Sequence, residues 1–411
     1  MNISQEFAPP YKLVIPYFIV GVVFYLVSIL YTFSFDVNNL HYQDPTVLAW
    51  VHLYLLGFVM MIIFGAMAQL LPVILEVGHF KVTLFYVIWP LLAFGALLMV
   101  GGFVFSTVLL PFGGTLVLIA MMIFIFEIFM TLMAVKKFNL AITTVLLANM
   151  SLFGGVLLGI IMALGYAGYL EIDFTSLLKG HIYLVIGGYI IITVMGLSMI
   201  LIPMFGLAHG FSDKPVKIAV SLMSISVIAM LASVVLGINA LSIVAYVLSI
   251  VAVLLYLYQV GVIYKSRARK IQDIYSHSLM VAFGSLLLAI VLGLVFFISG
   301  NEKFLQTSMW LIFTGFFGLL ISGHLYKIVP FLVWFEKFSA LVGKEKVPML
   351  ADMIPDRATY VQLIFASIGV AVSALGILFS NNELFKAGIS FSVMGAVFFM
   401  YSVIYILKFK G

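Results

Sequence analysis

Long apolar segments follow one another along the whole chain and are separated by short polar breaks. Most of these segments hold about 20 residues or more, the length that an α-helix needs to cross the hydrocarbon core of a bilayer. The pattern therefore predicts an all-α polytopic membrane protein with about twelve transmembrane helices. We expect these helices at residues 12–32, 46–75, 83–107, 109–134, 139–168, 177–208, 215–236, 239–263, 276–299, 305–335, 357–379 and 384–409.

The composition narrows this class further. Of the 411 residues, 65% are hydrophobic and 9% are charged, and the mean hydropathy is +1.28. Ordinary domains are about 45–50% apolar and about 25% charged. The absence of cysteine excludes disulfides, thiolate metal ligands and cysteine nucleophiles. We expect a single membrane domain over residues 1–411 in a lipid bilayer, with no cleavable signal peptide and no nucleic-acid partner.

The basic residues predict the orientation of the helices. If both termini lie inside, 17 of the 20 lysines and arginines fall on the cytoplasmic side, and the outer side keeps only Lys179, Lys303 and Lys386. Because cytoplasmic loops are enriched in basic residues, this asymmetry predicts an N-in/C-in topology. We expect a multi-pass protein of a bacterial-type inner (plasma) membrane. The cytoplasmic set includes Lys81, Lys136, Lys137 and the basic cluster between Lys265 and Lys270.

A glycine–glycine–proline spacing occurs three times, in the second, sixth and tenth expected helices. Its two intervals are 8 and 7 residues, and the copies lie about a third of the chain apart. Such recurrence indicates internal repeats, here about 1–137, 138–264 and 265–411 with about four helices each. We expect the glycines to allow close helix packing and the prolines to kink or close their helices. The copies are Gly57, Gly65 and Pro72; Gly188, Gly196 and Pro203; and Gly315, Gly323 and Pro330.

Four of the seven histidines fall in or at the start of expected helices. An ionisable group inside a membrane span is a functional candidate, because its burial there is costly. We expect the other three, His41, His79 and His209, to be surface residues. The candidates for metal ligation are His52, His181, His277 and His324.

His52 is the strongest of these candidates, because it lies near the outer end of the most regular copy of the repeat, and imidazole is a usual axial ligand of haem iron. His324 lies 14 residues deeper in the repeat frame, about 21 Å along a helix. We therefore expect His52 and His324 not to bind the same iron. His324 and His277 lie on consecutive helices and are expected to face each other, and whether they bind anything stays open.

Two charged residues inside expected helices are candidates for a proton path. They are Glu127 and Lys327. The structural interpretations are that Glu127 bonds a neighbouring helix and that Lys327 extends to the inner interface beside Trp334. The 22 methionines are scattered without a thioether cluster and are interpreted as packing residues rather than copper ligands.

The segment His52-Leu53-Tyr54-Leu55-Leu56-Gly57-Phe58, within the expected layout of three four-helix arcs, resembles subunit I of the haem-copper oxidases. It is more similar to the NnrS type of non-oxidase relative, which are haem- and copper-binding membrane proteins linked with nitric-oxide stress. Pro10-Tyr11-Lys12 and the proline that closes the second helix, Pro72, also fit that type. A looser match lies at Gly180-His181-Ile182-Tyr183.

The resemblance implies haem b held by His52, with His181 in the position of a copper ligand. Other ligand positions of the oxidases are not filled. The seventh helix has no histidine, the tenth carries Met309 and Trp310 at the required height, and Val185 replaces the oxidase tyrosine. Oxygen reduction is therefore disfavoured, copper is poorly supported, and any enzymatic activity is expected to be that of an oxidoreductase.

The sequence thus favours a haem-binding relative of the oxidase subunit that has lost the complete haem-copper centre. Its expected role is electron transfer, a response to nitric oxide or another gas, or haem handling, with a redox or respiratory partner or as a homo-oligomer. Two alternatives stay open. One is a cofactor-free transporter or channel in which His324, Lys327 and Glu127 line a path, and the other is a structural subunit of a respiratory assembly.

Overall fold

The computed structural model describes residues 10–136 and 138–410, so Lys137 of the basic set lies outside the described residues. Within them, 12 helical spans are long and apolar enough to cross a membrane, which confirms the prediction of a polytopic helical membrane protein. In chain order they are Tyr11–Ser34, Pro45–Leu75, Val82–Val104, Leu109–Met133, Leu140–Tyr166, Phe174–Gly206, Lys214–Leu236, Asn239–Ser266, Ile274–Ser299, Glu302–Leu341, Asp356–Leu378 and Asn382–Leu407. We number these spans I to XII.

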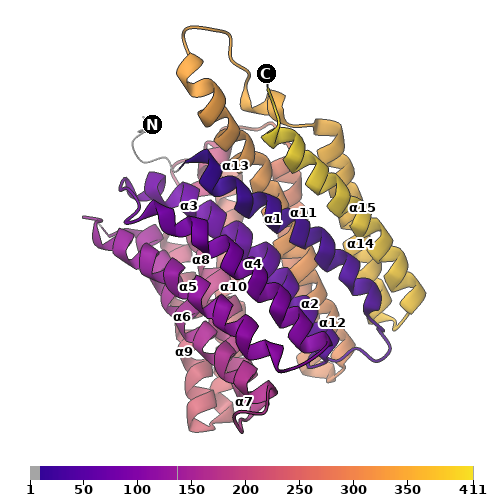
Figure 1. Cartoon of the computed structure of the whole chain (residues 1–411). Coiled ribbons are helices and arrows are strands. Elements are labelled where there is room, and N and C mark those ends of the chain that lie inside the picture. The colour runs from indigo at the N-terminus through magenta and orange to yellow at the C-terminus, as the bar shows by residue number, and fades with distance from the viewer. Residues whose placement is uncertain (1–9, 137, 411) are drawn as a thin grey trace. The chain divides into compact units, whose positions relative to one another are not determined.

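Several spans consist of more than one helical element (Figure 1). Spans II, VI and X each contain two α-helices with a different helical form between them. The α-helices are α1 (Tyr11–Tyr31), α2 (Pro45–Tyr54), α3 (Met61–Leu75), α4 (Phe85–Val104), α5 (Leu109–Met133), α6 (Leu140–Tyr166), α7 (Phe174–Ile182), α8 (Ile192–Gly206), α9 (Lys214–Leu236), α10 (Asn239–Ser266), α11 (Ile274–Ser299), α12 (Glu302–Trp310), α13 (Gly318–Phe338), α14 (Asp356–Leu378) and α15 (Asn382–Leu407).

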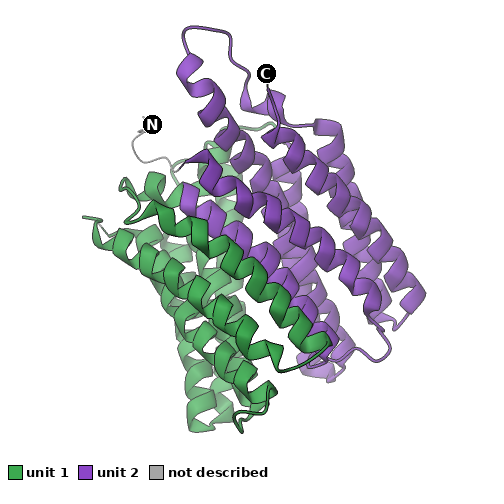
Figure 2. Ribbon diagram, viewed as in Figure 1, with its two compact units in different colours: residues 1–8, 70–271 green, residues 9–69, 272–411 purple. Residues whose placement is uncertain are grey.

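The chain forms two compact units (Figure 2). Unit 1 contains residues 70–271, which include α4 to α10, and unit 2 contains residues 10–69 and 272–410. The division falls inside α3, between Gln69 and Leu70. Unit 2 therefore combines the first helices of the chain with the last ones.

Small residues bring α14 and α15 of unit 2 together along their length. A Cβ added to Gly376 would lie 2.5 Å from the Phe385 backbone nitrogen, and one added to Gly395 would lie 2.8 Å from that of Ala366. Lipid tails are as apolar as the helices, so close van der Waals packing at small residues stabilises such pairs. In unit 1, Gly95 and Gly113 form the same kind of seam between α4 and α5.

Spans II, VI and X each contain a π-helical segment. These segments are η3 (Leu55–Met60), η5 (Tyr183–Ile191) and η6 (Leu311–Phe317). Each includes the first glycine of its Gly–Gly–Pro copy: Gly57, Gly188 or Gly315. π-Helical turns inside α-helices are rare and are frequent at functional sites.

The glycines of each copy lie against the preceding span of the same unit, which confirms the predicted close helix packing at these glycines. The first glycine meets one residue of that span, and the second glycine meets the residue seven positions earlier on it, as two antiparallel helices require. A side chain at any of these glycines would overlap its neighbour. The contacts are Gly57 with Phe24 and Gly65 with Tyr17; Gly188 with Ser151 and Gly196 with Thr144; and Gly315 with Ser285 and Gly323 with Ser278.

The three prolines differ in their effect on the helix. Helix α3 ends three residues after Pro72, at Leu75, and α8 ends three residues after Pro203, at Gly206. Of the two effects expected of these prolines, a kink or closure of the helix, closure does not occur at Pro330, because α13 continues to Phe338. That extension is held by side-chain bonds, in which Trp334 Nε1 donates to the Pro348 carbonyl at 2.8 Å and Lys337 Nζ to the Phe409 carbonyl at 2.6 Å.

Candidate functional site

His52 lies in the last turn of α2, three residues before η3 begins. Its Nδ1 donates a hydrogen bond to the Leu48 carbonyl, one turn earlier, at 2.8 Å. A carbonyl can only accept, so the proton of the neutral ring lies on Nδ1 and the lone pair on Nε2. Metal-bound histidines commonly have this arrangement, in which one nitrogen ligates and the other donates to a carbonyl. Nε2 of His52 is therefore the nitrogen with ligand character.

His181 and His324 have the same tautomer for the same reason. His181 Nδ1 donates to the Gly155 carbonyl of α6 at 2.8 Å, and His324 Nδ1 donates to the Leu320 carbonyl of its own helix at 2.8 Å. His181 lies two residues before η5, so in both spans II and VI a histidine lies two or three residues before the π-helical segment. His324 instead follows η6 by seven residues.

The turn of α2 that holds His52 packs on an aromatic cluster in unit 2. Trp50 stacks on Trp310 with 5.8 Å between ring centroids, and the Tyr54 hydroxyl donates to the Phe313 carbonyl at 2.7 Å. Trp50 and Tyr54 are four residues apart and share one face of α2, while His52 is about 200° around the helix from each. The face of span II that packs on span X is therefore filled by aromatic rings, and His52 lies on another face.

The residues around His52 suit haem in one respect and not in another. The donor chemistry of His52 suits axial ligation, because Nε2 holds the lone pair. A porphyrin clamped between spans II and X, as in the oxidases that the sequence resembles, does not fit. The stacked pair of Trp50 and Trp310 occupies that interface, and each side chain is at most 5% exposed.

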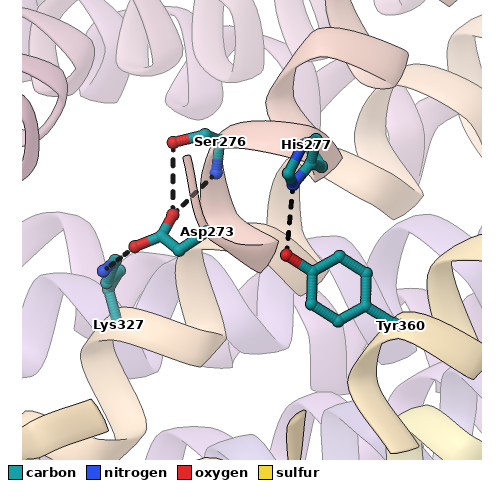
Figure 3. A network of polar contacts seen from close by, with 5 residues as sticks. All are labelled: Asp273, Ser276, His277, Lys327 and Tyr360. Atoms are coloured by element: carbon teal, nitrogen blue, oxygen red, sulfur yellow. Dashed lines mark hydrogen bonds and ion pairs between the residues drawn. The ribbon is translucent and has the colours of Figure 1, made fainter. Parts of the chain in front are cut away.

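His324 and His277 do not have the shared environment that the sequence predicted. The ring of His324 meets the edge of Tyr275, with 5.2 Å between centroids and an interplanar angle of 90°. His277 Nδ1 lies 3.3 Å from the hydroxyl of Tyr360 on α14 (Figure 3). Tyr275 and His277 are about 200° apart on α11, so only one of them can face His324. The residue of α11 that faces His324 is therefore Tyr275 and not His277.

Lys327 forms an ion pair with Asp273, which precedes the first residue of α11. Its Nζ lies 2.6 Å from Asp273 Oδ2, while Asp273 Oδ1 accepts from the backbone nitrogen and the hydroxyl of Ser276 (Figure 3). Burial raises the pKa of the Asp273 carboxyl, but the charge and hydrogen bond of Lys327 and the bonds from Ser276 lower it by more. Asp273 is the N-cap of α11, so Lys327 ties spans IX and X together.

Glu127 bonds His79, which the sequence analysis placed at the surface. The two side chains are 0% and 3% exposed, and His79 Nδ1 lies 3.0 Å from Glu127 Oε1. The surface prediction for His79 is therefore wrong. The reason is that the segment after α3 folds onto α5, where the Phe80 backbone nitrogen donates to Thr131 Oγ1 at 3.0 Å. His209 is exposed as expected, and His41 is half-buried and stacks on Tyr42.

No group of three or more His, Cys, Asp or Glu side chains that could hold a metal ion occurs among residues 10–136 and 138–410. Compared with models of known protein families and with curated proteins, the chain matches none of them. Helix length and hydropathy identify it as a multi-pass helical membrane protein.

Proposed function

We propose that the protein binds haem b through Nε2 of His52 and acts in electron transfer, in a response to nitric oxide or another gas, or in haem handling. The observation that carries this proposal is the 2.8 Å bond from His52 Nδ1 to the Leu48 carbonyl. It gives Nε2 the lone pair and fixes the plane of the ring before any ligand arrives. Such pre-orientation is what an axial ligand needs.

The position of His52 beside a π-helical segment supports the proposal. In a π-helical turn the backbone bonds run from residue i to residue i+5, so the helix widens and turns its following residues to a new direction. His52 and His181 both stand at the start of such segments, within two or three residues. The recurrence favours a functional role for the start of spans II and VI over a role for His324, which stands elsewhere in its span.

The proposal includes a three-repeat architecture, with pseudo-repeats of about 1–137, 138–264 and 265–411. Three like pairs of helices support it, since spans I–II, V–VI and IX–X each show a π-helical segment and two glycines on partners seven residues apart. Superposition of the three arcs on a pseudo-threefold axis tests this part. The basic residues support an N-in/C-in orientation in a bacterial-type inner membrane.

The chemistry at the proposed site is limited by the residues present. Bound haem would supply one-electron transfer and gas binding at its iron. The Leu48 carbonyl accepts a hydrogen bond from Nδ1–H and so increases the basicity of Nε2, and the packing of Trp50 and Tyr54 holds this turn of α2 in place. Oxygen reduction is not part of the proposal, because the histidines of a copper site are missing from span VII.

The first experiment is the visible absorption spectrum of the wild-type protein, purified in detergent from haem-sufficient cells. We expect a Soret band and a pyridine haemochrome typical of haem b. Protein that is folded but carries no haem would contradict the proposal. A transporter would then be the better function, and the buried carboxyl of Glu127 inside span IV is the observation that favours it.

A further inference from the structure

An open hollow of about 490 Å³ lies at the carboxyl end of α15, in unit 2. Sites for small molecules have volumes of about 300–1,000 Å³. The residues that line the hollow come from the last two turns of α15 and from the tail that follows it, residues 408–410. They are Tyr401, Ile404, Tyr405, Lys408, Phe409 and Lys410. The hollow therefore offers both apolar and cationic groups to a ligand.

Contacts with α13 hold the tail that forms one side of the hollow. The ring of Phe409 packs edge-on against Phe338, with 6.3 Å between ring centroids. Lys337 Nζ donates to the Phe409 carbonyl at 2.6 Å and to the Leu407 carbonyl at 3.3 Å. Because these contacts fix the tail, the hollow is formed before a ligand arrives, and binding costs less ordering of the chain.

The electrostatics of this end of α15 suit an anion. The carboxyl end of a helix carries a partial negative charge that would repel one, but here the Lys337 ammonium bonds two of the terminal carbonyls and offsets that charge. The positive charge of Lys410 acts on Lys337, so the two ammonium groups repel each other. Glu336 is exposed, and no ion pair between described residues involves Lys408 or Lys410. A bound anion would relieve this repulsion.

An apolar stripe leads from the hollow along α15. Its residues recur every three or four positions, so they share one face of the helix, and each is between 39% and 52% exposed. They are Tyr405, Tyr401, Val397 and Met394. Span XII ends at Leu407, so the lysines of the tail lie at the level of the lipid headgroups, where tyrosines are also enriched. An acyl chain fits the stripe, and a headgroup fits the hollow.

We propose that this hollow binds one anionic phospholipid, with the phosphate between Lys408 and Lys410 and an acyl chain along the stripe from Tyr405 to Met394. A lysine ammonium binds phosphate as a point charge. The choline of a zwitterionic lipid brings a cation that the two lysines repel. A free phosphate has no acyl chain to cover the stripe. The occupant is therefore a lipid, because the hollow and the stripe are continuous along one helix face.

Native mass spectrometry of the full-length protein in detergent tests the proposal, with phosphatidylglycerol and phosphatidylcholine of the same acyl chains as probes. The wild type should bind its first phosphatidylglycerol more tightly than phosphatidylcholine. K408Q/K410Q should weaken the binding of phosphatidylglycerol by about tenfold or more, because both cations are removed. K408R/K410R keeps the charges and should bind as the wild type does.

K386Q is the matched control, since Lys386 is an exposed lysine near the other end of α15 and should leave the binding of both lipids unchanged. Equal binding of the two lipids by the wild type, or equal weakening by K408Q/K410Q and K386Q, would overturn the proposal. Displacement of phosphatidylglycerol by excess inorganic phosphate would also overturn it, in favour of a soluble anion. If K408Q/K410Q does not fold, K410Q decides the matter, because Lys410 lies beyond the helix, and unchanged binding of phosphatidylglycerol would contradict a phosphate contact.

Discussion

Spans II and X share a backbone plan and differ in the side chains that it presents. Both have a π-helical segment at the first glycine and a close contact of both glycines with the preceding span. Span II places His52 three residues before its π-helical segment, whereas span X has Trp310 next to its own, packed on Trp50. The comparison shows that the same backbone plan presents a histidine in span II and a buried tryptophan in span X.

The glycine contacts give the largest expected effect on stability. Gly57→Val should lower the free energy of unfolding by about 3 kcal/mol, because the new side chain overlaps the ring of Phe24. Gly315→Val should have an effect of the same sign, since its Cβ would lie 2.7 Å from that of Ser285. Thermal or SDS unfolding of the purified protein measures both.

Gly284→Ala is the control for this series, because a Cβ at Gly284 meets no atom within 4 Å. Alanine favours the helix over glycine by about 1 kcal/mol, so this variant should be neutral or stabilised. Equal destabilisation by all of these substitutions would show that the repeated glycines have no special contacts.

Spans II and X also differ in their polar side chains. Span X has Lys327, which forms an ion pair with Asp273, whereas span II has the uncharged and buried Gln69. Lys327→Met should cost about 1–2 kcal/mol, because it removes the ammonium group and its hydrogen bond from a partly buried carboxylate. The pKa of Asp273 is lowered in the folded protein, so the stabilisation is present above the unfolded pKa of about 3.9 and is lost as pH falls through the folded value.

Unfolding of the wild type and of Lys327→Met as a function of pH checks this effect, and the two curves should converge in acid. Lys217→Met is the matched control, since Lys217 pairs with Asp213 at 2.8 Å on an exposed surface, where such pairs contribute about 0–1 kcal/mol. A loss at Lys327 no larger than at Lys217 would contradict a stabilising tie between spans IX and X.

The sequence predicted what depends on local pattern. The lengths of the apolar segments predicted all the spans. The Gly–Gly–Pro spacing predicted the close packing at Gly57 and its equivalents. It did not predict the π-helical segments, because a change of hydrogen-bond register leaves no clear trace in residue type. It also missed the pairing of His79 with Glu127, which are 48 residues apart, since folding of a short segment brings them together.

The C-terminal end of span X also depends on contacts that are distant in the sequence. The prediction ended this helix at 335, but α13 runs to Phe338, where Lys337 bonds the carbonyls of Leu407 and Phe409. These partners come from the far end of the chain, so no local signal contains them.

The central claim is that His52 ligates haem iron, and the absorption spectrum of His52→Gly tests it most directly. The variant should lose or shift the Soret band while it still inserts and folds, and added imidazole should restore the band by filling the space of the deleted ring. The matched control His324→Ala removes a histidine of the same tautomer from span X and should keep the wild-type spectrum. A wild-type spectrum in His52→Gly without imidazole would contradict the claim.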